Sequence, residues 1–187
     1  MLNFFRSAVL GLSALLFSLP ALAEEETPFP WLGFTESMAL NEEVPKPVIV
    51  YIYTDWAGWG RRMDAEVWSD PEIQALATEA YFIRFDGERK DDVVFQGQTF
   101  SYNPSGRRGY HELSAAMMEN RLSYPTTVMF DEEMRIVLSV PGFRSAEELH
   151  PVLMFIIGGH SLNVDFDTYK EAYVSPYPEV QTEALSE

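Results

Sequence analysis

The sequence predicts an α/β fold, a central sheet flanked by helices, from the pattern between residues 46 and 68. Residues 48–53 read VIVYIY, an uncharged run of β-branched and aromatic residues that is typical of a strand buried on both faces. A turn rich in tryptophan and glycine follows, and helical spacing begins at Arg61. A strand, a tight turn and a helix start in this order form the layout that α/β folds use for active sites.

Composition narrows the possible partners and chemistry. The 187 residues suit one domain with appendages, and 29 acidic against 13 basic residues give a net charge of −16. Nucleic acids and anionic membrane surfaces attract clusters of lysine and arginine, so neither is an expected partner. The chain contains no cysteine, which excludes disulfides, thiolate nucleophiles and thiolate metal sites.

Residues 1–23 have the pattern of a secretory signal peptide. A single positive charge, Arg6, precedes an apolar run that is too short to span a bilayer, and Ala21 and Ala23 supply the small residues of a cleavage site. The mature chain is predicted to begin at Glu24 and to be periplasmic or secreted, with no membrane anchor after cleavage. An uncleaved anchor helix is the alternative.

The remaining pattern predicts one domain at 46–159 between an N-terminal extension at 24–45 and an acidic tail at 160–187. Aromatic and apolar residues are expected to attach both extensions to the domain. Within it we expect a helix capped by Ser69, a strand at 81–85, an insertion at about 88–108 with a small hairpin, a helix at 110–121, strands at 126–130 and 134–140, and a helix from Ser145 to Gly158 in which Pro151 makes a kink or marks the true start.

Two motifs give the chain a family resemblance. Residues 55–63 read Asp-Trp-Ala-Gly-Trp-Gly-Arg-Arg-Met, which resembles the Asp-Trp-Cys-x-Trp-Cys-Lys/Arg-Arg-Met segment of exported bacterial thioredoxin-related proteins. Tyr124-Pro125-Thr126 is similar to the proline loop of that family, and residues 106–113 are similar to its insertion helix. The resemblance covers about 46–159 and implies a thioredoxin-like fold with a mixed sheet and a cis peptide before Pro125.

The same resemblance argues against the family's activity. Members exchange disulfides by thiolate attack, and the second cysteine resolves the mixed disulfide. The matching positions here, the ends of the Ala57-Gly58-Trp59-Gly60 segment, carry an alanine and a glycine. Thiol–disulfide exchange by this chain is therefore excluded, and we expect a redox-inactive protein. No cofactor and no metal are expected, because the three histidines lie far apart in sequence.

The sequence favours protein binding at the position of the lost active site. The resemblance implies a shallow apolar groove at Trp56, Trp59, Tyr124, Pro125 and Thr126, suited to an extended segment of another exported protein. The two tryptophans could instead pack against the insertion. Two other functions stay open: an oxidoreductase lineage whose cysteines were lost or replaced in this copy, and a structural partner that uses the acidic tail and has no peptide groove. The sequence does not indicate an oligomeric state.

Overall fold

The structure of the protein, a computed structural model, describes residues 28–178. The predicted signal peptide, the predicted mature start at Glu24 and residues 179–187 of the acidic tail lie outside the described residues.

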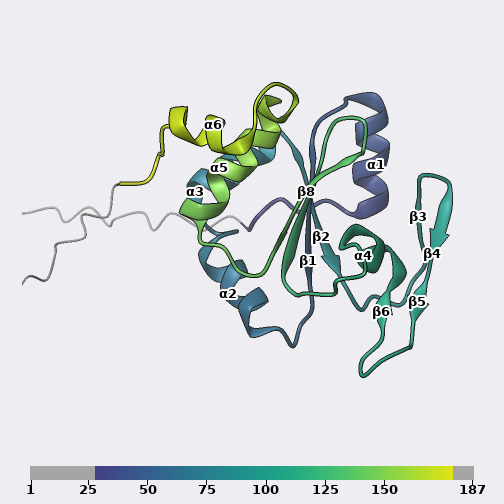
Figure 1. Ribbon diagram of the computed structural model, residues 1–187. Helices are drawn as coiled ribbons and strands as arrows, with labels where there is room; N and C mark the ends of the chain where they lie inside the picture. Colours follow the sequence, from purple (N-terminus) through teal and green to yellow (C-terminus); the bar gives the residue numbers. More distant parts are fainter. Residues whose placement is uncertain (1–27, 179–187) are drawn as a thin grey trace, which may run out of the picture.

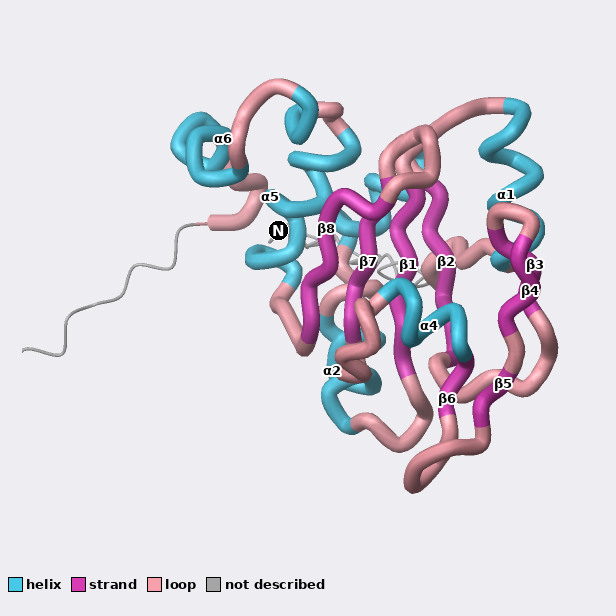
Figure 2. The backbone as a smooth tube through the Cα atoms, turned by 45° about the vertical axis from the view of Figure 1, so that its right-hand side comes forward, coloured by secondary structure: helices cyan, strands magenta, loops and turns pink. Residues whose placement is uncertain are grey.

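A four-stranded mixed sheet forms the centre of the molecule, with the strand order β2-β1-β7-β8 (Figure 2). β1 pairs in parallel with β2 and antiparallel with β7, and β7 pairs antiparallel with β8. The strands are β1 Val48–Tyr53, β2 Tyr81–Asp86, β7 Thr126–Phe130 and β8 Ile136–Pro141. The predicted mixed sheet is confirmed, and β1 has the predicted bounds.

Helices cover both faces of this sheet (Figure 1). On one face lie α2 Gly58–Glu66, α3 Pro71–Ala75 with the 3-10 turn η1 Leu76–Thr78, and α5 Ala146–Ile157. On the other lie α1 Phe34–Glu43 and α4 Glu112–Met117. Alternate residues of β1 belong to the two hydrophobic clusters, Ile49 to the first and Val50 to the second, as expected for a strand buried on both sides.

The register of β1 sets the position of the candidate site. Ile52 near the carboxyl end of β1 pairs with Thr126 at the start of β7, and Tyr53 pairs with Asp86 at the end of β2. The chain therefore leaves β1, leaves β2 and enters β7 at the same end of the sheet. Segments that are distant in sequence meet there.

The insertion forms two short hairpins beside α4. β3 Val93–Phe95 pairs with β4 Gln98–Phe100, and β5 Tyr102–Asn103 pairs with β6 Tyr110–His111. The expected hairpin is confirmed, but the expected helix at 110–121 is too long. Its first two residues are taken by β6, and the helix starts only at Glu112, where the N–H of Leu113 donates to Nδ1 of His111. It ends early because Glu119 and Asn120 adopt left-handed backbone conformations.

Both extensions attach to the domain through aromatic and apolar side chains, as predicted. Trp31 stacks on Tyr51 at a centroid distance of 5.8 Å, and the backbone of Leu32 adds a parallel bridge to Ile83 of β2. In the tail, which includes η2 His160–Leu162 and α6 Phe166–Ala172, the hydroxyl of Tyr173 lies 2.7 Å from Nδ1 of His150.

The N-cap of α3 corrects one prediction. Asp70, not Ser69, caps this helix, and its Oδ1 accepts hydrogen bonds from the N–H groups of Glu72 and Ile73. Pro71 explains the difference, because proline is favoured at the first helical position and makes the preceding residue, Asp70, the cap. The helix at the other end of the domain, α5, starts at Ala146 and continues through Pro151.

Asp70 also holds the tail, since the hydroxyl of Tyr177 donates to its Oδ1 at 2.8 Å. Asp70→Ala should therefore lower the free energy of unfolding by about 1–2 kcal/mol, the usual cost of a lost N-cap together with the lost tail contact. Urea unfolding of Ser69→Ala provides the matched control, which should lose less than about 0.5 kcal/mol. Equal losses in the two variants would mean that Asp70 is not the effective cap.

Candidate functional site

A buried tyrosine supports the turn that follows β1. The hydroxyl of Tyr51 donates to the carbonyl oxygen of Gly60 at 2.9 Å, and burial raises the pKa of that hydroxyl, followed by the charge of Asp64. Within the turn, the N–H of Ala57 donates to Thr54 O at 3.1 Å, and the N–H of Gly60 donates to Ala57 O at 3.0 Å. Ala57 is thus fixed as the N-cap residue of α2, at the positive end of the helix dipole.

The two positions that match cysteines keep the spacing of a disulfide. A Cβ placed on Gly60 would lie 3.9 Å from Cβ of Ala57, and its nearest other neighbour would be the Tyr51 hydroxyl at 3.4 Å. Disulfides require a Cβ–Cβ separation of about 3.5–4.5 Å. The backbone therefore has the geometry for a bridge, although neither residue can form one.

Two titratable side chains near this turn, Tyr51 and Asp64, are already protonated or paired. Tyr51 stays protonated because its pKa is raised, and its hydrogen bond to Gly60 is satisfied. Asp64 has a pKa raised by burial, and its carboxylate is paired with Arg84 at 2.8 Å. Within residues 28–178 there is also no group of three or more side chains placed to hold a metal ion.

Trp56 projects from the turn and is held by contacts with residues of three loops. Its side chain is 48% exposed, and its ring lies edge-on to Tyr124 with centroids 6.1 Å apart. Its indole N–H donates to Oε1 of Glu88 at 3.0 Å, and the Arg108 guanidinium lies 5.0 Å from the ring centroid. A large aromatic surface is therefore presented to solvent in a fixed orientation.

Tyr124 provides the second wall of the site and an open backbone edge. The Tyr124–Pro125 peptide is cis, as the family resemblance implies. Burial raises the pKa of the Tyr124 hydroxyl. The backbone N–H and C=O of Tyr124 make no hydrogen bond with any residue between 28 and 178. An extended peptide can pair with such free backbone groups.

A groove of about 540 Å³ lies between this loop and the insertion. Its lining consists of Trp56, Glu88, residues 105–110, Leu122 and Tyr124. Sequence reasoning identified Trp56 and Tyr124 and missed the other residues. The insertion was recognised as a segment, but no periodicity connects its arginines with Trp56. That contact depends on how the β5–β6 hairpin folds back.

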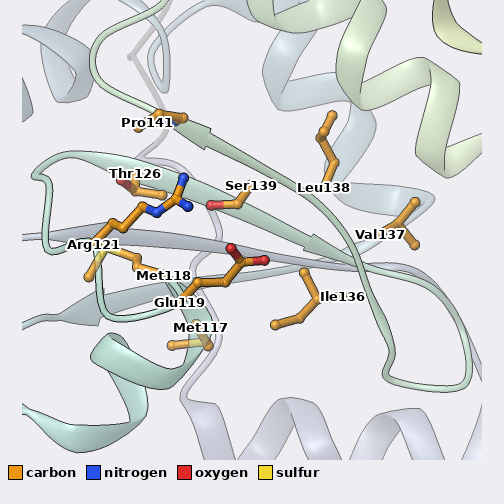
Figure 3. Close-up of a pocket in the computed structure, with 10 residues that line it drawn as sticks. All are labelled: Met117, Met118, Glu119, Arg121, Thr126, Ile136, Val137, Leu138, Ser139 and Pro141. Carbon is orange, nitrogen blue, oxygen red and sulfur yellow. The ribbon is translucent and has the colours of Figure 1, made fainter.

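The structure does not bring the other predicted site residues into this groove. Trp59 is 57% exposed and contacts Phe143 and the Arg62 guanidinium instead. Pro125 is buried. Thr126 is also buried and lines a second hollow of about 370 Å³, between the end of α4 and the edge strand β8 (Figure 3).

Comparisons with known proteins agree with this architecture. A family model described as Thioredoxin-like domain matches residues 34–157. A thioredoxin from Thermus thermophilus aligns at 18% identity over 68% of this chain and 85% of its own length, with a TM-score of 0.50. A putative disulphide-isomerase from Bacteroides thetaiotaomicron aligns at 17% identity over 73% and 93%, with a TM-score of 0.49. A thioredoxin-fold protein from Helicobacter pylori aligns at 16% identity over 68% and 84%, with a TM-score of 0.48.

A sequence comparison with curated proteins gave no match. Among residues 28–178, none of the helices is both long enough and apolar enough to cross a membrane.

The orientation of Tyr124 depends on Gly87, and this dependence can be tested. A Cβ on Gly87 would lie 2.8 Å from both Cζ and Oη of Tyr124, closer than real Cβ contacts allow. Gly87→Ala should therefore displace the Tyr124 ring and lower the free energy of unfolding by about 1–3 kcal/mol, the typical cost of overpacking. Near-ultraviolet circular dichroism and urea unfolding measure the two effects.

Gly58→Ala provides the control for this substitution, because its new Cβ would meet only Arg61 Nη2 at an ordinary 3.8 Å. Alanine is the better helix former, so this variant should be no less stable than the natural chain. The penalty of Gly87→Ala should also shrink in a Tyr124→Ala background. A penalty of the same size in both backgrounds would contradict the assignment.

The retained spacing at Ala57 and Gly60 predicts a gain of redox chemistry. In the double variant Ala57→Cys/Gly60→Cys, the two thiols should oxidise to a disulfide. The thiol introduced by Ala57→Cys should titrate below the free-thiol value of about 8.5, since it caps α2, whose first turn has no acidic residue. Thiolate absorbance against pH measures this shift. The double variant should reduce insulin in a turbidity assay, and the natural chain should not.

The pair Ala57→Cys/Gly58→Cys carries the same number of thiols at the wrong spacing and should be inactive. Activity in the natural chain would reveal a mechanism that needs no thiol. A folded Ala57→Cys/Gly60→Cys variant that forms no disulfide would contradict the retained geometry.

Proposed function

This chain belongs to the thioredoxin-like domain family and contains no cysteine, and we propose that it acts by binding an extended segment of another exported protein. One observation carries the proposal. The exposed ring of Trp56 stands beside Tyr124, whose backbone N–H and C=O make no hydrogen bond within residues 28–178. An extended chain could form backbone hydrogen bonds at Tyr124 and place a side chain against the Trp56 ring.

Export is part of this proposal and rests on the sequence of residues 1–23. A basic residue, a short apolar run and small residues before Glu24 would direct the chain through a secretory membrane and release it by cleavage. Its ligand would then be a protein of the same compartment, periplasmic or extracellular.

Descent from a thiol–disulfide oxidoreductase is a second proposal, favoured by the 3.9 Å separation at Ala57 and Gly60. It concerns ancestry, since the present chain cannot perform thiolate chemistry. The two proposals are compatible, because an oxidoreductase that grips its substrate by backbone pairing would keep that grip after losing both thiols.

Selection of a displayed random peptide library on the mature chain tests the proposed function. Peptides that bind the natural chain should lose about 1–2 kcal/mol of affinity or more to Trp56→Ala, because truncation of a central aromatic residue is typical of a binding hot spot. Trp59→Ala is the matched control and should bind these peptides with unchanged affinity, because Trp59 packs on Phe143 outside the groove. Equal affinities for the natural chain and Trp56→Ala would contradict binding at this groove.

A further inference from the structure

The wall of the groove at Trp56 carries positive charge that the fold does not neutralise. Arg107 and Arg108 both line the groove, and neither forms an ion pair with a residue in the range 28–178. Four arginines among residues 28–178, Arg62, Arg84, Arg89 and Arg135, pair with carboxylates, whereas Arg61, Arg121 and Arg144 form no ion pair either. Two adjacent unpaired guanidinium groups are notable in a protein with 29 acidic and 13 basic residues.

The lining contains one carboxylate, Glu88, which orients the tryptophan. Its Oε1 accepts the hydrogen bond of the Trp56 indole, and it forms no ion pair with Arg107 or Arg108, so the lining carries two positive charges and one negative charge. The guanidinium of Arg108 lies over the same tryptophan, 5.0 Å from the centroid of the Trp56 ring. The Arg108 side chain donates no hydrogen bond to a residue between 28 and 178, and a guanidinium carries five N–H donors. The N–H groups of Arg108 therefore remain available to a ligand.

The groove lining also contains apolar and aromatic side chains. Leu122, which is 42% exposed, and Tyr124 belong to it together with Trp56. A ligand that fills the groove thus meets apolar and aromatic surface as well as two guanidinium groups. Carboxylates are the peptide groups that guanidinium donors bind best, through charge-assisted and often bidentate hydrogen bonds.

We propose that the groove selects an extended peptide segment in which a carboxylate side chain neighbours an apolar or aromatic residue. This inference rests on the proposed peptide-binding function and specifies its ligand. The net charge of −16 does not oppose it at physiological salt, where the screening length is about 8 Å. At that ionic strength, acidic residues elsewhere on the surface are screened, whereas the two guanidinium groups would contact the ligand directly.

Two peptides that differ only in charge test the inference. One is the heptapeptide Gly-Ser-Leu-Glu-Tyr-Asp-Gly, acetylated and amidated at its ends, and the other carries Gln and Asn in place of Glu and Asp. Calorimetric titration of the mature chain should show the acidic peptide binding about four- to ninefold tighter, the product of two exposed ion pairs that each strengthen binding about two- to threefold.

Arginine variants locate the origin of this preference. In Arg107→Gln/Arg108→Gln the preference for the acidic over the amide peptide should fall to about twofold or less. Arg107→Gln alone, which leaves the contact of Arg108 with Trp56 intact, should remove about half of the preference on a logarithmic scale. Arg135→Gln is the control for Arg107→Gln, because it also removes one positive charge. Arg135 lies in the β7–β8 turn, at the other end of β7 from Tyr124, so this variant should keep the full preference.

The outcomes separate the inference from the function on which it rests. If both peptides bind equally and lose affinity in Trp56→Ala, the acidic preference is overturned while peptide binding stands. A preference that survives in Arg107→Gln/Arg108→Gln would also overturn it. If neither peptide binds at millimolar concentration, and library selection yields no peptide sensitive to Trp56→Ala, the proposed function fails and the inference fails with it.

Discussion

The antiparallel pairing of β1 with β7 is the constraint on which the rest of the site depends. Because Ile52 pairs with Thr126, the chain leaving β1 and the chain entering β7 emerge side by side at one end of the sheet. Trp56 and Tyr124 follow from that register, one just after its strand and the other just before. Burial of β1 on both faces maintains the register, since a slip by one residue would move each side chain to the opposite cluster.

Short sequence patterns correctly predicted β1 and the loop before β7, because neighbouring residues determine both. An uncharged β-branched run gave β1 its bounds, and the proline before a second such run located the loop at Tyr124. Competition between local signals explains two misses. Ser69 and Asp70 are both good caps, and Pro71 selects the second; residues 110–111 have helical spacing, and pairing with β5 makes them a strand.

The groove could be predicted only in part because it is assembled by tertiary contacts. Trp56 and Tyr124 were found because they belong to recognisable motifs. Glu88, Arg108 and Leu122 reach the same groove from the end of β2, from a hairpin loop and from the segment after α4. Nothing in their sequence spacing encodes that convergence. It depends on the lengths and directions of three separate connections.

The absence of cysteine separates the chemistry of the family from the binding that we propose at the same turn. Disulfide exchange needs a thiolate and a resolving thiol, which the side chains at Ala57 and Gly60 cannot provide. Peptide binding needs an aromatic surface and free backbone groups, and Trp56 and Tyr124 still supply both. Tyr51 supports the turn through its hydrogen bond to Gly60, so the turn is held in place without any contribution from a thiol or a disulfide.

Selectivity in such a site would have to come from its walls. Backbone pairing at Tyr124 is nearly the same for every peptide, so it supports affinity without distinguishing sequences. The C-terminal tail and the insertion differ in whether they reach the groove. The tail packs on α3 and α5 through His150 and Asp70, whereas the β5–β6 hairpin reaches Trp56 and forms one wall of the groove. The insertion is thus the appended segment placed to distinguish one extended ligand from another.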